Sequence, residues 1–200
     1  MSFSVKGYIM SLILASASPR RKELMGLYHV PFVIRAADID ETMAPDADPA
    51  AEVGRVSCLK ARATPREPGD VVVAADTIVV CDGKVLGKPR SPEEAVDMLT
   101  MLSGRDHQVM TGVTVLREDM AETFTEITRI HFRELSQGQI RAYVDTGEPM
   151  DKAGAYGIQG GAALFCSHMI GDYYNVMGLP VCRLGEVLRK MAPDMMGEFV

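Results

Sequence analysis

The run Val71-Val-Val-Ala-Ala75, followed by Asp76 and then by Thr77-Ile-Val-Val-Cys81, decides how the rest of this sequence is interpreted. A continuous apolar run of this length is typical of a central strand. The second run ends at Asp82-Gly83, a pair that favours a tight hairpin turn. Asp76 therefore interrupts a strand that should be buried. A lone buried carboxylate is costly unless it meets a cation, a metal ion or a proton-transfer task.

Strands and helices are indicated on both sides of this central run. Further strands are expected at Leu12–Ala15, Val30–Ala37, His107–Arg117, Thr123–Arg133 and Ala162–Ile170. Helices are expected from Ser18, over Pro49–Ala63, from Pro92 to near Gly104, over Ser136–Thr146 and over Leu179–Met191. Several hairpins combine with only some strand-to-helix crossovers, which predicts an α/β fold with a mixed, twisted sheet flanked by helices. Residues 11–200 are expected to form this single domain, after an N-terminal extension over residues 1–10.

Helix starts give the firmest local predictions. Ser18 precedes Pro19, which suits an N-cap followed by proline at the first helical position. Ser91 is followed three residues later by Glu94, the spacing of a capping box. Ser136 begins a second capping box of the same kind.

Composition narrows the classes of function. The chain has 200 residues and a formal net charge of -6, so we expect neither nucleic acid nor an anionic membrane as a partner. The cysteines are Cys58, Cys81, Cys166 and Cys182. They form no CxxC pair, which predicts free, mostly buried thiols in a reducing, cytoplasmic setting. The four histidines show no HxH or HxxxH spacing, so no histidine is assigned as a metal ligand.

The N-terminus imitates a secretion signal, because Lys6 precedes the apolar stretch Tyr8–Ala15. That stretch is short and is interrupted by Ser11. Cleavage after it would also remove the strand that presents the basic segment described next. We therefore favour a disposable extension over a signal.

The segment Ser16-Ala-Ser18-Pro-Arg20-Arg21-Lys22 places hydroxyl groups and three cations at a helix N-terminus. Free backbone N–H groups and the positive end of the helix dipole favour phosphate there, and guanidinium groups add bidentate hydrogen bonds. A capped helix with a solvated basic turn is the alternative, although cations at this end oppose the dipole. The pattern favours an anion site.

Four other residues are candidates for binding a metal ion or phosphate, or for accepting a proton. Asp76 is a candidate metal ligand or proton acceptor, and the sequence alone does not separate the two roles. Glu41, in the acidic loop Asp38-Ile-Asp40-Glu41, is a candidate oxygen ligand for Mg²⁺ or Mn²⁺. Lys88, between Gly87 and Pro89, is a candidate phosphate clamp, and Lys60 is a weaker one.

The loop Gly147–Gly161 contains five glycines, and long loops of this kind are often functional. Its Gln159 offers an amide with donor and acceptor groups, which suits the edge of a nucleobase. Tyr156 in the same loop either stacks on a ligand or fills the core.

Six strings together resemble the Maf family over residues 12 to 190. They are Ser16-x-Ser18-Pro-Arg-Arg, Ala75-Asp76-Thr77, Gly87-Lys88-Pro89, Leu102-Ser-Gly-Arg-x-His107, Lys152-Ala-Gly-Ala-Tyr-Gly-Ile-Gln-Gly160 and Asn175-Val-x-Gly-Leu-Pro180. Each string is weak alone. Their common order along the chain makes chance a poor explanation.

The resemblance implies hydrolysis of a nucleoside triphosphate to the monophosphate and pyrophosphate, on a fold similar to that of the inosine triphosphate pyrophosphatases. It implies that Asp76 is the proton acceptor and that Glu41 and Asp76 share a divalent metal. The residues implied in setting specificity are Arg20, Thr77 and Gln159. The residues expected to hold phosphates are Ser16, Ser18, Arg21, Lys60 and Lys88.

Within the family, Ala155-Tyr-Gly-Ile-Gln-Gly160 looks like the branch that acts on dTTP and UTP. The branch that acts on 7-methyl-GTP is an alternative. So is a nucleotide-binding regulator of cell division, with nucleotide as ligand and not substrate. The expected partner is a nucleoside triphosphate, and a homodimer is left open.

Overall fold

The computed structural model describes residues 4–5, 8–44 and 47–197. The strands are β1 Ser4–Val5, β2 Tyr8–Ile9, β3 Leu12–Leu14, β4 Phe32–Ile34, β5 Val71–Cys81, β6 Lys84–Leu86, β7 Asp106–Arg117, β8 Met120–Phe132 and β9 Cys166–Ile170. The α-helices are α1 Pro19–Gly26, α2 Pro49–Ala63, α3 Pro92–Leu102, α4 Gln137–Val144, α5 Tyr173–Met177 and α6 Val181–Met191. Three short 3-10 helices follow α4, namely η1 Glu148–Asp151, η2 Ala153–Ala155 and η3 Gly161–Leu164.

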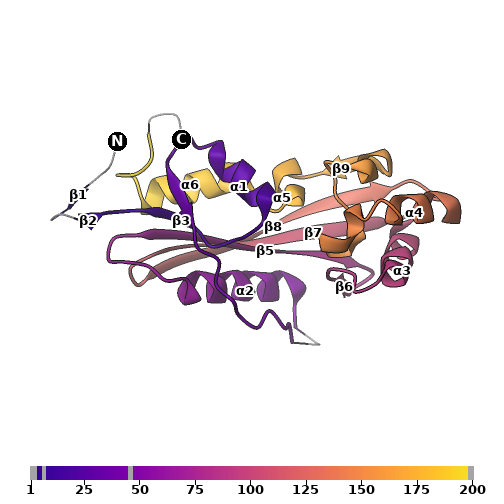
Figure 1. Ribbon diagram of the computed structural model, residues 1–200, viewed down its shortest axis with the longest axis horizontal. Helices are drawn as coiled ribbons and strands as arrows, with labels where there is room; N and C mark the ends of the chain where they lie inside the picture. Colours follow the sequence, from indigo (N-terminus) through magenta and orange to yellow (C-terminus); the bar gives the residue numbers. More distant parts are fainter. Residues whose placement is uncertain (1–3, 6–7, 45–46, 198–200) are drawn as a thin grey trace. The chain divides into compact units, whose positions relative to one another are not determined.

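Seven strands form one mixed sheet (Figure 1). Its order is β4-β3-β5-β7-β8-β9, with β6 pairing to β5. Strand β3 is parallel to both β4 and β5, whereas β6 is antiparallel to β5 and β9 is antiparallel to β8. The mixed α/β fold with helices flanking a mixed sheet is therefore confirmed. The extension contributes the separate antiparallel pair of β1 and β2.

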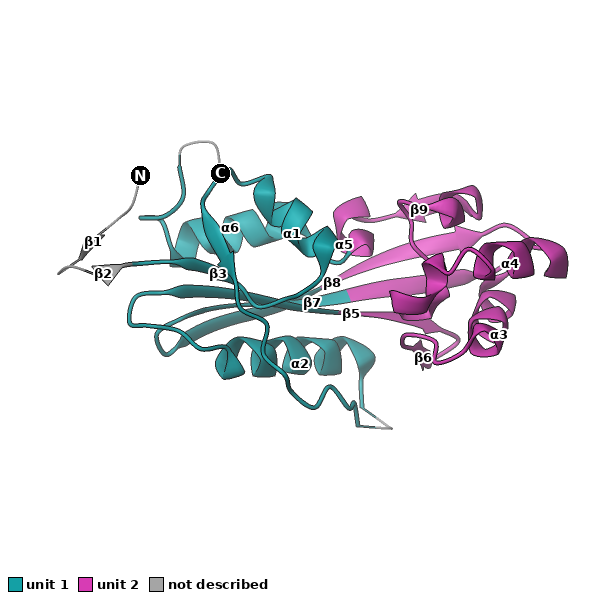
Figure 2. Ribbon diagram, viewed as in Figure 1, with its two compact units in different colours: residues 1–76, 111–125, 178–200 teal, residues 77–110, 126–177 magenta. Residues whose placement is uncertain are grey.

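The chain divides into two compact units, shown in Figure 2. Unit 1 comprises residues 1–76, 111–125 and 178–200, and unit 2 comprises residues 77–110 and 126–177. The boundary falls inside β5, β7 and β8, so each of these strands contributes residues to both units.

In unit 1, α2 lies on one face of the sheet and α1 and α6 lie on the other (Figure 1). Helix α2 begins where the sequence predicts, because the side chain of Asp48 accepts hydrogen bonds from the N–H groups of Ala50 and Ala51. Its Ala61 joins a buried apolar cluster with β3, β5 and β7 residues. Across the other face, the Tyr28 hydroxyl after α1 donates to the Val181 carbonyl at the start of α6.

Unit 2 has its own apolar core, which gathers α3, α4 and the inner faces of β5, β7 and β8. The capping box of Ser136 is confirmed in both directions. That of Ser91 is only half formed, since Ser91 accepts from the N–H of Glu94, whereas the Glu94 carboxylate turns to the N–H of Arg90. Helix α3 is nevertheless where the sequence places it.

One strand prediction is wrong in its bounds, and one helix was not predicted. The strand expected over Ala162–Ile170 begins only at Cys166, and η3 occupies the residues before it. The cause lies at Gly161, whose N–H donates to the Glu148 carboxylate and so turns the chain away from extended structure. The five-residue helix α5 has no counterpart among the sequence predictions.

The four cysteines are free, as expected. Only Cys81 is fully buried, however, and Cys182 is exposed, so the expectation of mostly buried thiols is wrong. Among the residues that the structure describes, no helix is long and apolar enough to cross a membrane.

Candidate functional site

Asp76 lies beside the end of β3. Strands β3 and β5 are parallel, with Leu14 opposite Val73, and the N–H of Ala15 donates to the Val73 carbonyl. Ser16 therefore leaves β3 at the edge of the sheet where β5 continues to Asp76. Ligands of open α/β sheets bind at the carboxyl ends of parallel strands, and Asp76, in the middle of β5, lies beside the carboxyl end of β3.

Lys60 pairs directly with Asp76. Its ammonium nitrogen Nζ lies 2.8 Å from Asp76 Oδ1 and 2.9 Å from Glu41 Oε1. The side chains of Lys60 and Asp76 are 11% and 12% exposed, whereas that of Glu41 is 56% exposed. Helix α2 thus supplies the cation that makes burial of the Asp76 carboxylate tolerable. The sequence did not predict this pairing.

The basic segment forms a second part of the same unit. Ser16, at the end of β3, is buried, and its Oγ accepts hydrogen bonds from the Ser18 N–H and from Arg21 Nη1, each 3.2 Å long. Arg21 also donates from Nε to the Gly178 carbonyl, at 2.8 Å. Gly178 belongs to the string Asn175-Val-x-Gly-Leu-Pro180, so one role of that string is to hold the guanidinium.

Ser18 is the N-cap of α1, but its side chain makes no capping hydrogen bond. The Ser18 side chain therefore supplies no acceptor to the first turn, and no acidic residue lies in that turn. Both features favour an anionic ligand at this point.

Charge couples the basic segment to Asp76. Burial lowers the pKa of Arg21 from its ordinary value, and the negative charge of Asp76 acts in the opposite direction. Arg20 and Glu41 also act on this pKa, the first lowering it and the second raising it. Ser16, Arg20, Arg21, Glu41, Lys60 and Asp76 thus form one cluster, which we call the unit 1 cluster.

The other predicted site residues lie in unit 2. Thr77 is half-buried in β5, and Lys88 and Gln159 are exposed. The Gly87 carbonyl accepts a hydrogen bond from the Gly154 N–H, which ties the turn carrying Lys88 to the glycine-rich loop carrying Gln159. The structure therefore brings the first-helix cations to Asp76, whereas the approach of Lys88 to that carboxylate stays a prediction.

The glycine-rich loop is firmly built. Gly154 has φ +67 and lies so close to Val79 that a Cβ would stand 2.8 Å from its side chain. Tyr156 is buried, and its hydroxyl lies 2.9 Å from His107 Nε2. Tyr156 therefore packs in the core of unit 2. Of the two roles that the sequence allowed, core packing is the correct one. Burial lowers the pKa of His107 to about 4.

The carboxylates of Glu41 and Asp76 fit a divalent metal. Both present an oxygen to the single Lys60 ammonium, so two hard ligands already converge on one positive charge. Asp40, by contrast, accepts a hydrogen bond from the Thr42 N–H within its own loop.

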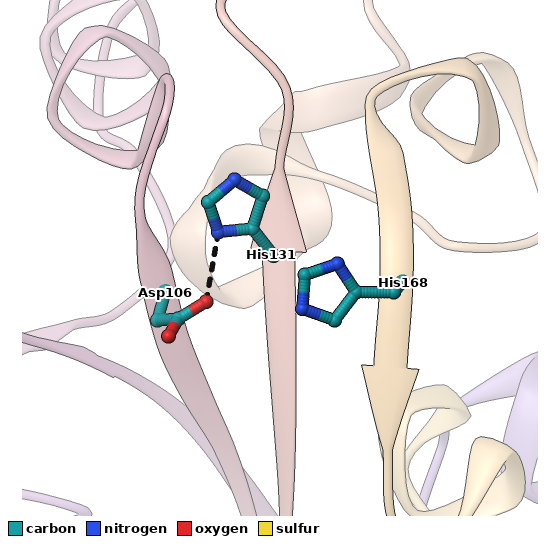
Figure 3. Close-up of side chains that lie close together, drawn as sticks. All are labelled: Asp106, His131 and His168. Carbon is teal, nitrogen blue, oxygen red and sulfur yellow. Dashed lines mark hydrogen bonds and ion pairs between the residues drawn. The ribbon is translucent and has the colours of Figure 1, made fainter.

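A different group of metal-ligand residues lies in unit 2. It consists of Asp106, His131 and His168, whose ligand atoms all lie within 4.8 Å of one another (Figure 3). The sequence assigned no histidine to a metal, because these residues are brought together by strand pairing and not by local spacing.

Comparison with known proteins places the chain in a family. The family described as Maf-like protein matches residues 11–191. This chain belongs to the Maf family. Similar Maf relatives named dTTP/UTP pyrophosphatase come from Symbiobacterium thermophilum, at 53% identity over 88% of this chain and 92% of the relative, and from Moorella thermoacetica, at 48% identity over 93% and 97%. One from Bacillus pumilus is 49% identical over 88% and 94%.

The fold of this Maf chain also resembles a solved structure, that of a HAM1 protein from Coxiella burnetii. The TM-score is 0.53 over 91% of this chain and 100% of the other, at 14% sequence identity. The likeness concerns the fold alone, and it agrees with the inosine triphosphate pyrophosphatase-like architecture expected from the sequence.

Proposed function

We propose that this Maf protein is a nucleoside triphosphate pyrophosphatase that hydrolyses dTTP and UTP to the monophosphate and pyrophosphate. The unit 1 cluster carries the proposal, since it combines a nearly buried carboxylate with arginines at an open helix N-terminus. The names of relatives at 48% to 53% identity support the choice of substrate. Removal of such nucleotides before polymerases incorporate them is the corresponding physiological role.

Asp76 acts as the proton acceptor for the attacking water. Lys60 donates to Oδ1 and so fixes the carboxylate that would receive the proton. Because Lys60 and the strand β5 fix the carboxylate, little reorganisation is needed when substrate arrives.

The phosphates are held by cations and hydroxyls from the start of α1. Arg21 is already oriented by Ser16 and by the Gly178 carbonyl, and Arg20 adds a second guanidinium beside it. Fixed guanidinium groups offset the charge that develops on the leaving pyrophosphate without further reorganisation. Ser18 contributes its N-cap position, where backbone N–H groups face an anion.

Glu41 and Asp76 would hold a divalent ion, for which we favour Mg²⁺ or Mn²⁺ because both ligands are carboxylates. When bound, such an ion neutralises phosphate oxygens. Lys60 contacts both carboxylates and keeps them converging. Its phosphate-binding role stays a prediction.

The remaining roles stay predictions. The family resemblance gives Lys88 a phosphate-binding role and gives Arg20, Thr77 and Gln159 a role in specificity. A nucleotide-binding regulator of cell division and a pyrophosphatase that prefers 7-methyl-GTP remain the alternatives. Analysis of the products formed from each nucleotide distinguishes them. We further propose that residues 11–200 work as one catalytic domain in the cytoplasm.

The test is turnover by Asp76→Asn, measured as pyrophosphate released from dTTP and UTP. Asparagine keeps the shape and an acceptor for Lys60 but loses the proton-accepting oxygen, so kcat should fall at least about 100-fold while the fold is kept. Asp119→Asn is the matched control, because Asp119 is an exposed carboxylate in the same unit outside the cluster. Near-normal turnover by Asp76→Asn would rule out the proposed base.

A further inference from the structure

Three strands of unit 2 present the side chains of one additional cluster. Asp106 begins β7, His131 lies near the end of β8, and His168 lies in β9. His131 and His168 are directly opposite each other in the antiparallel pairing of β8 with β9, so their side chains share one face of the sheet. The Phe132 N–H donates to the Arg105 carbonyl, which brings the start of β7 to the same level.

The three side chains converge in Figure 3. His131 Nδ1 lies 2.8 Å from Asp106 Oδ1. The imidazole rings of His131 and His168 are nearly parallel, with an interplanar angle of 11° and centroids 5.0 Å apart. One ligand atom from each residue lies within 4.8 Å of the others. Among the described residues, no other group of three or more His, Cys, Asp or Glu side chains comes together in this way.

The chemistry of these donors selects a class of ion. Two imidazoles and one carboxylate are the ligands of open zinc sites and of other divalent transition-metal sites, whereas Mg²⁺ prefers oxygen ligands alone. We propose that Asp106, His131 and His168 bind one divalent transition-metal ion of the zinc class. No residue of this site belongs to the unit 1 cluster.

Modest side-chain rotation completes the coordination. Ligand bonds of about 2.0–2.1 Å bring neighbouring donors to about 3.3 Å from each other, so the most separated donors must approach by about 1.5 Å. All three side chains are partly or fully exposed, which leaves space for this rotation. The backbone need not move, because the ligands sit on adjacent hydrogen-bonded strands.

Some neighbouring groups favour binding of a metal ion at this site, and one weakens it. The hydrogen bond between His131 Nδ1 and Asp106 Oδ1 already holds the carboxylate against one of the two imidazoles. Ser167 is hydrogen-bonded to His168 Nδ1, at 3.3 Å, which helps to orient the ring. Arg129 is a nearby positive charge acting on Asp106, and it weakens the attraction of the site for a cation.

Metal binding here would fasten the edge of the sheet. Strand β9 pairs only with β8 in the strand order and directly follows η3 and the glycine-rich loop. An ion bound by residues of β7, β8 and β9 therefore links β9 to the two neighbouring strands. Because the ion binds only the folded state, it stabilises that state.

Calorimetric titration of the metal-free protein with Zn²⁺ is the test. With Mg²⁺ in excess to occupy the carboxylates of the unit 1 cluster, we expect one Zn²⁺ per chain, and a Kd for Zn²⁺ raised at least tenfold in His168→Asn and in His131→Asn. His29→Asn is the matched control, since His29 is an exposed histidine of unit 1. Bound Co²⁺ should give d–d absorption without a sulfur charge-transfer band, which separates this site from the exposed thiol of Cys182.

Thermal unfolding supplies an independent readout. Zn²⁺ should raise the Tm of the wild type and of Asp76→Asn, but not that of His168→Asn, whose Tm without metal should match the wild type. If either histidine variant proves unfolded without metal, Asp106→Asn replaces it in the titration. Absence of Zn²⁺ binding by the wild type, or wild-type affinity in the site variants, would overturn the proposal.

Discussion

Substitution of Gly112 by alanine tests how α2 is seated on the sheet. Gly112 lies in β7 beneath the helix, and a Cβ at this position would stand 2.6 Å from the Gly54 nitrogen and closer still to the Val53 carbonyl oxygen. Ordinary contact begins at about 3.4 Å, so the helix would have to retreat by close to 1 Å. The obstacle is backbone, which cannot rotate away as a side chain can.

The cost should be that of overpacking, about 1–3 kcal/mol in the free energy of unfolding. With a urea m-value of about 2 kcal/mol per M, the midpoint of unfolding should fall by about 0.5–1.5 M. Lys60 lies on the same helix, so the displacement should also loosen its 2.8 Å contact with Asp76 and lower kcat. Urea unfolding followed by circular dichroism measures the first effect, and pyrophosphate release measures the second.

Gly54→Ala is the matched control on the helix side of the same contact. Its Cβ would meet only the side chains of Thr123 and Thr125, at 3.4 Å and 3.3 Å. Alanine is also favoured over glycine within a helix by about 1 kcal/mol. Stability should therefore change by less than about 1 kcal/mol. An unchanged midpoint in Gly112→Ala, or a larger loss in Gly54→Ala, would refute this account of the packing.

Three further predictions follow from other contacts. His107 has a folded pKa of about 4 and an unfolded value near 6.5, so its contribution is fully present above pH 6.5. As pH falls from 6.5 towards 4, only the unfolded chain takes up this proton, so up to about 3 kcal/mol of the free energy of unfolding should be lost. A series of urea unfolding curves at different pH measures this loss, and His107→Gln should reduce it. Gly160→Ala would set a Cβ 2.5 Å from Glu148 Oε2, so it should disturb the loop that carries Gln159. The KM for dTTP should rise, while the Tm should fall only slightly. Ser136→Ala removes a formed capping box and should cost about 1 kcal/mol, whereas Ser18→Ala, which removes no capping hydrogen bond, should leave the Tm nearly unchanged.

The sequence predicts features that depend on near neighbours. Helix α2 begins at Pro49 because Asp48 caps it, and β5 is central because Val71–Cys81 is almost wholly apolar. The anion-binding character of the basic segment is also local, since it needs only a serine-proline helix start followed by arginines. The start of α2 and the central position of β5 are confirmed because tertiary contacts reinforce the local preference. The anion-binding character of the basic segment stays a prediction.

Features that depend on pairing between distant strands escaped prediction. Lys60 reaches Glu41 and Asp76 only after α2 has been placed against the sheet. His131 and His168 meet through the register of β8 with β9, which contains an irregularity beside His131 that no spacing rule reveals. The error over Ala162–Ile170 also comes from a contact outside the local pattern, because the Glu148 carboxylate accepts a hydrogen bond from the Gly161 N–H, thirteen residues further along the chain.

The products formed from dTTP and UTP test the central claim most directly. Separation of the nucleotides after incubation of the wild type with Mg²⁺ or Mn²⁺ should yield the monophosphate and pyrophosphate in equal amounts, with slower turnover of 7-methyl-GTP. Release of inorganic phosphate with the diphosphate, or tight binding of dTTP without any product, would contradict the assignment of the unit 1 cluster to pyrophosphohydrolysis.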